Sequence, residues 1–171
     1  MGKIKKLLIA GALSILAAGA ISFGNNYHIR SLARDSAECV ANAPKIKNKT
    51  ELLEKLNNYR EKFEISQDEK IQVELYDYNS DEEFRKKFNL GGINYSPFLN
   101  EIMRLGYHNY LIKILAEDAN DCSLIHELGH IKGNHLEKLA SIKNPIYKYL
   151  VEWYVVEPEA VSFANKRENY Q

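Results

Sequence analysis

The stretch CSLIHELGHIKGNH (residues 122–135) decides how this chain is interpreted, because it contains three of the five histidines. His126, Glu127 and His130 form a His-Glu-x-x-His pattern within it. On a helix, residues four apart lie one turn above each other, so His126 and His130 can direct their rings at one metal ion. Glu127 lies about 100° around the axis, where it can serve as a general base. The pattern predicts a zinc site, with one Zn²⁺ per chain, on a helix.

The residues around the pattern are apolar, and they predict that this helix packs into the core. A histidine pair with a glutamate on such a helix needs partners, because buried polar groups without partners are costly, and a metal ion would supply them. Gly129 should allow a neighbouring element to approach closely. We expect Asp118 or Asp121 to cap the helix and Gly133 to end it. The apolar residues in question are Leu124, Ile125, Leu128 and Ile131.

A catalytic zinc site takes three protein ligands, so a third must come from elsewhere in the chain. Glu157 is the preferred candidate, because it shares a helix face with the small residues Ala160 and Ala164. Glu159 is the second choice, and Glu152 precedes a proline that should interrupt the helix. His135 would lie about 140° away from His130 if the motif helix continued, which makes it a weak candidate.

The elements around the motif predict an α+β fold. Apolar residues recur at helical spacing after Thr50, which should cap a helix over residues 50–63. Strands are expected at residues 71–78 and 108–115, the second with Tyr110, Ile112 and Ile114 on one face. Short helices are expected at 31–40, 81–88 and 98–105. The final segment should kink at Pro158 or begin a second helix near Glu157. Tyr154 is expected in the core.

The N-terminus carries a different signal. Three lysines precede an uncharged run of 17 residues, Leu7 to Phe23. Such a run is typical of a signal peptide or a membrane anchor, and the positive flank should stay in the cytoplasm. We therefore expect three parts: a signal peptide or membrane anchor at 1–23, a connector at 24–49 and a domain at 50–171. Cys39 and Cys122 could pair outside the cytoplasm, although two buried thiols are the simpler expectation.

HELGH followed by EPEAVSFA resembles the ImmA/IrrE-type zinc metallopeptidases, a branch of the gluzincins, over about residues 65–168. The resemblance implies a minimal zincin-like domain, with a short β-sheet packed on the motif helix and a C-terminal helix. It also implies that His126, His130 and Glu157 are zinc ligands and Glu127 the general base. Family members commonly carry Asp or Asn where this chain has Val161. That residue supports a ligating histidine, so its loss either weakens that support or leaves it to another group.

These observations predict a zinc metallopeptidase, a hydrolase acting on a polypeptide substrate. It would be either anchored to a membrane by its N-terminal helix, with the body on the non-cytoplasmic side, or secreted after cleavage. The alternative is a membrane-tethered, non-catalytic zinc-binding protein for interaction or sensing. A formal net charge of +0 gives no sign of nucleic-acid binding.

Overall fold

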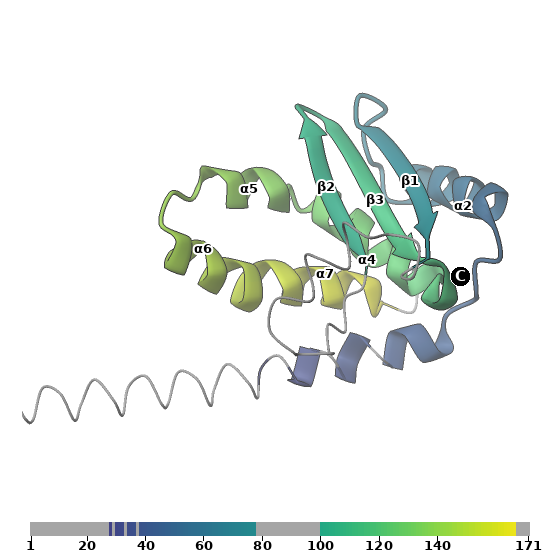
Figure 1. The fold of residues 1–171 in the computed structure, drawn as a ribbon, viewed down its shortest axis with the longest axis horizontal. Coiled ribbons are helices and arrows are strands. Elements are labelled where there is room, and N and C mark those ends of the chain that lie inside the picture. The colour runs from purple at the N-terminus through teal and green to yellow at the C-terminus, as the bar shows by residue number, and fades with distance from the viewer. Residues whose placement is uncertain (1–27, 29, 33, 37, 78–99, 167–171) are drawn as a thin grey trace, which may run out of the picture.

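The computed structural model describes residues 28–166, except residues 29, 33, 37 and 78–99. It shows an α+β fold in which a three-stranded sheet packs against helices (Figure 1). The expected N-terminal apolar helix and the expected helix at 81–88 lie outside the described residues. Among the residues that the structure describes, no helix is long and apolar enough to cross a membrane.

The sheet has the order β1-β3-β2, with β3 (Asn109–Leu115) in the centre. It runs parallel to β1 (Lys70–Tyr76) and antiparallel to β2 (Glu101–Gly106). Tyr110, Ile112 and Ile114 are all buried, as their alternation predicts. The expected helix at 98–105 is wrong, because residues 101–106 form β2. A two-residue turn at Tyr107 and His108 lets this segment pair with β3, and that pairing outweighs a local preference for helix.

Among the described residues, the following helices pack against the sheet or against one another. Helix α2 (Lys49–Lys62) packs on β1, while α4 (Asp121–Lys132) contacts β2, β3 and α2. Helix α7 (Glu157–Ala164) runs along α4 (Figure 1). Asparagines cap α2 and α4. Asn48 accepts a hydrogen bond from the Glu51 amide, and Asn120 accepts one from the Ser123 amide. The expected caps at Thr50 and at Asp118 or Asp121 are therefore wrong by one or two residues.

The chain between α4 and α7 is helical but irregular. Helix α5 (His135–Ser141) follows α4 directly, and α6 (Pro145–Val151) begins after Asn144-Pro145. A π-helical turn, η2 (Glu152–Val156), then joins α6 to α7. Pro158 is the second residue of α7, directly after the π-helical turn, and it lacks the N–H that a continuous regular helix would use. The expected second helix beginning at Glu157 is thus confirmed.

Cys39 and Cys122 form a disulfide, with their Cα atoms 5.8 Å apart. The expectation of two free thiols is wrong, because the segment before residue 50 folds back onto α4. The Ile46 amide donates to the Ala119 carbonyl at 2.9 Å, and the Asp121 amide donates to the Pro44 carbonyl at 3.0 Å. Ile46 is also buried in the core. Part of the expected connector at 24–49 therefore belongs to the packed domain.

Candidate metal centre

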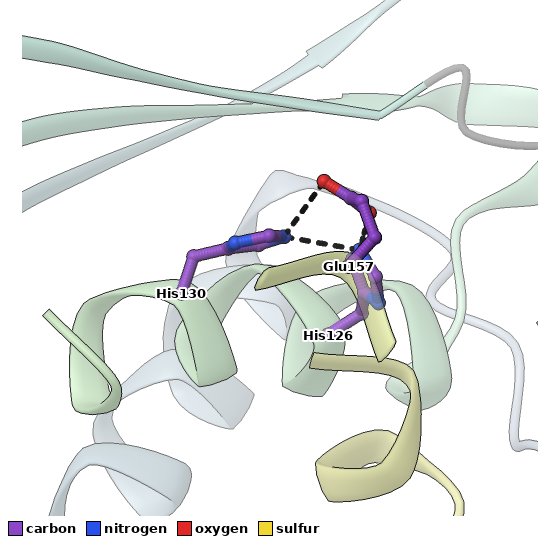
Figure 2. Close-up of side chains that lie close together, drawn as sticks. All are labelled: His126, His130 and Glu157. Atoms are coloured by element: carbon purple, nitrogen blue, oxygen red, sulfur yellow. Dashed lines mark hydrogen bonds and ion pairs between the residues drawn. The ribbon is translucent and has the colours of Figure 1, made fainter. Parts of the chain in front are cut away.

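His126, His130 and Glu157 meet between two helices (Figure 2). The histidines extend from neighbouring turns of α4, and Glu157 is the first residue of α7. The two Nε2 atoms lie 3.2 Å apart. The Glu157 carboxylate places one oxygen 3.5 Å from His126 Nε2 and the other 3.7 Å from His130 Nε2. One potential ligand atom from each residue thus falls within a sphere that a single ion could bind.

The distances within the cluster can be compared with those expected between the ligands of a tetrahedral metal ion. Ligand atoms about 2.0–2.1 Å from a tetrahedral metal lie about 3.3 Å from one another. The 3.2 Å between the two Nε2 atoms lies close to that value, whereas the 3.5 and 3.7 Å separations join the histidines to different oxygens of the Glu157 carboxylate. Two imidazole nitrogens with one carboxylate are also a donor set that catalytic zinc sites use. The three residues could therefore hold a metal ion.

Small residues bring the two helices close enough for this meeting. A Cβ added at Gly129 would lie 3.0 Å from Phe163 Cδ1 and 3.5 Å from the Ala160 Cα. Ala160 and Ala164 are each 1% exposed. The α4–α7 contact thus relies on side chains of minimal size, as expected for Gly129 and for the small face beyond Glu157. A larger residue at Gly129 would push Glu157 away from the histidines.

Burial and neighbouring charges shift the pKa values of the two clustered histidines in opposite directions. Burial lowers the pKa of His126, but the interaction with Glu157 and the charge of Glu127 outweigh burial, so that pKa is raised. Burial, with the nearby His126, lowers the pKa of His130 to about 3. Burial raises the pKa of Glu157, yet the surrounding histidines lower it overall. In the metal-free protein these pKa shifts favour a charged His126 beside a charged Glu157, and a neutral His130.

Glu127, the predicted general base, is 3% exposed and is not one of the three clustered residues. Its charge acts on its neighbour His126. Glu152 lies near enough to Glu157 for repulsion to matter: burial and then the Glu157 charge raise the pKa of Glu152. Glu152 is not a member of the metal-binding group either. The Glu157 carboxylate thus contacts the two histidines, and the carboxylates of Glu127 and Glu152 lie nearby.

The other candidate residues have different roles. Glu159 does not reach the cluster, because its carboxylate contacts His135 Nε2 at 2.9 Å. Cys122 is buried, as predicted, but in the disulfide. The expectation of a buried Tyr154 is wrong: it is 41% exposed and stacks on His28 with ring centroids 4.5 Å apart. Tyr154 lies within the π-helical turn η2, which departs from the regular helix on which that expectation rested.

From the sequence, His135 is only a weak ligand candidate, and its contact with His130 is not predicted. His135 is 2% exposed, and its Nδ1 lies 3.2 Å from His130 Nδ1. A continued helix would have carried His135 away from His130. The signal that could have revealed it is Gly133-Asn134, since asparagine readily adopts the left-handed conformation that reverses a helix end.

Comparison with protein-family profiles, with characterised proteins and with solved structures finds no significant match.

Proposed function

We propose that this protein is a zinc-dependent metallopeptidase. The observation that carries the proposal is the convergence of His126, His130 and Glu157, whose two Nε2 atoms are separated by about the distance found in a tetrahedral zinc site. The resemblance of HELGH and EPEAVSFA to the ImmA/IrrE-type peptidases, with their zincin-like domain, points to the same chemistry. The buried Glu127 adjoins the cluster, where a general base is needed.

Each residue has a distinct part in the proposed reaction. His126 Nε2, His130 Nε2 and a Glu157 oxygen hold the ion. When bound, zinc supplies Lewis acidity and makes water a competent nucleophile near neutral pH. The Glu127 carboxylate accepts the proton of the attacking water and delivers it to the leaving amine. The reaction consumes one water and one peptide bond and yields a carboxylate and an amine.

The sheet offers a place for an extended polypeptide substrate. Strand β2 contacts α4 and, within the described residues, pairs only with β3. The outer edge of a strand presents backbone N–H and C=O groups that can bind another strand. A substrate paired there would run beside the helix that carries His126 and His130. We propose β2 as the substrate-binding edge.

The disulfide supports a location outside the cytoplasm. Such bonds persist in oxidising compartments and are rare where thiols are kept reduced. Cys39 and Cys122 are paired, and the chain begins with three lysines and an uncharged run from Leu7 to Phe23. We propose a body that is exported, either anchored to the membrane or released after cleavage.

Metal content is the first test. The purified chain should contain about one zinc after dialysis, measured by elemental mass spectrometry. Glu157→Ala should lose the ion, because one of three ligands is removed. Ser162→Ala is the control at an exposed position on the same helix, and it should keep the ion. A wild-type protein that folds without zinc, and takes up none when it is added, would refute the proposal.

Turnover is the second test. Glu127→Gln should retain zinc and lose hydrolysis of a quenched fluorescent peptide pool by at least a hundredfold. One observation favours a non-catalytic zinc protein instead: His126, Glu127 and His130 are each at most 7% exposed. If wild type and Glu127→Gln both bind zinc and show equal turnover, the non-catalytic function replaces the peptidase.

A further inference from the structure

His135 and Glu159 form a hydrogen-bonded chain behind His130. His135 Nδ1 lies 3.2 Å from His130 Nδ1, and His135 Nε2 lies 2.9 Å from Glu159 Oε2. The chain begins at the ring nitrogen of His130 that faces away from the metal cluster. It runs through a buried imidazole and ends at a carboxylate whose side chain is 54% exposed. Both nitrogens of His135 are therefore occupied by these two contacts.

The positions of the protons follow from the contacts once His130 binds a metal. Coordination uses the lone pair of His130 Nε2, so the ring proton must sit on Nδ1. That N–H can donate only to a nitrogen with a free lone pair, which makes His135 Nδ1 the acceptor. The proton of His135 must then sit on Nε2, where Glu159 Oε2 accepts it. This placement of the protons satisfies the hydrogen bonds of His130, His135 and Glu159 together.

The backbone after α4 is shaped to allow this arrangement. Asn134 adopts the left-handed conformation, with φ 55°, and turns the chain back so that His135 lies over the end of the helix. A Cβ at Gly133 would overlap His135 Nε2 and lie 2.6 Å from its Cδ2, so only glycine leaves room for the ring. Helix α5 is then tied to the sheet, because the Tyr110 hydroxyl donates to Glu137 Oε1 at 2.9 Å.

We propose that His135 and Glu159 are positioning residues that orient His130 for metal binding. Histidine ligands generally donate their second N–H to a carboxylate, a carbonyl or water, and such partners fix the ring and increase its basicity. Val161 occupies the position where the resembling family carries Asp or Asn, and it is buried and apolar. In this chain a histidine–carboxylate pair from α5 and α7 supplies the support. The inference rests on the proposed zinc site.

Three variants of the full chain test it by zinc affinity, measured in competition with a chromophoric chelator. Glu159→Ala removes the outer link at an exposed position, and Ser162→Ala, one turn further along α7, is its control. Gly133→Ala keeps every polar group but displaces the His135 ring. Its φ of −78° and ψ of −5° suit alanine, so its backbone is unstrained. His135→Phe removes both links while keeping a ring.

We expect His135→Phe and Gly133→Ala to weaken zinc binding about 10- to 100-fold, and Glu159→Ala by a smaller factor. Ser162→Ala should match wild type. His135→Asn should recover part of the loss, because its side-chain oxygen can accept from His130 Nδ1–H. If His135→Phe does not fold, the zinc affinities of Glu159→Ala and Gly133→Ala still test the proposal, because Glu159 is exposed and the backbone at Gly133 is unstrained.

Imidazole ¹H–¹⁵N spectra of the zinc-loaded protein give a second readout that a purely structural role would not change. Wild type should show a protected Nδ1–H on His130 and an Nε2–H on His135, and Gly133→Ala should lose the protection of the first. Unchanged affinity in Gly133→Ala and Glu159→Ala, or a proton on His135 Nδ1, overturns the positioning role and leaves the zinc site standing. A wild type without zinc overturns the site itself.

Discussion

Breaking the disulfide between Cys39 and Cys122 should cost this protein much of its stability. The bond joins residues separated by 83 positions and connects the segment before α2 to the first turn of α4. Closing a loop of that length removes chain entropy from the unfolded state worth about 4.5 kcal/mol at 25 °C. The unfolded chain retains some residual structure, so this is an upper bound. A typical domain has a stability of about 5–15 kcal/mol, so the loss is a large fraction.

The assay is urea unfolding of the chelator-treated protein, followed by circular dichroism with and without reductant. Reduction should lower the free energy of unfolding by about 2–4.5 kcal/mol. The double variant Cys39→Ala/Cys122→Ala should show a similar loss and no response to reductant. The reasoning fails if the reductant leaves the unfolding curve of wild type unchanged after thiol labelling shows that both cysteines have been reduced.

Three further outcomes are expected. Zinc binding at pH 6.5 should release protons, because the raised pKa of His126 keeps part of its population charged and a charged ring cannot bind the ion. Zinc affinity should fall as the pH falls further. Calorimetry in two buffers of different ionisation enthalpy measures the proton release, which should diminish as the pH is raised above that pKa, and a release that does not change with pH would contradict this. Gly129→Val should push α7 away from α4 through contact with Phe163 and destabilise the fold by about 1–3 kcal/mol. It should also bind zinc more weakly than the control variant Gly106→Ala. Equal zinc affinity in the two variants would contradict the close-contact argument. Asn120→Ala should cost about 1 kcal/mol of stability through loss of the α4 cap, and a thermal unfolding midpoint equal to that of wild type would show that the cap contributes nothing.

Local pattern was sufficient for much of the site. Residues four apart on a helix share a face whatever surrounds them, so the pairing of His126 with His130 follows from spacing alone. The break near Glu157 follows from the missing N–H of Pro158. Strand alternation likewise placed Tyr110, Ile112 and Ile114 on one buried face. In each of these cases the cause lies within a few residues of its effect.

Contacts distant in sequence decided the rest. Residues 101–106 became a strand because β3 was available to pair with them, and Cys39 met Cys122 because the chain before α2 folds back. His135 reached His130 through a single left-handed residue, which changes the direction of everything after it. Glu157 faces the histidines, as the small residues on its helix face predict, but it is the packing of α4 on α7 at Gly129 that brings it to them. Helical and strand periods reveal which side chains share a face, but only packing determines which face meets which.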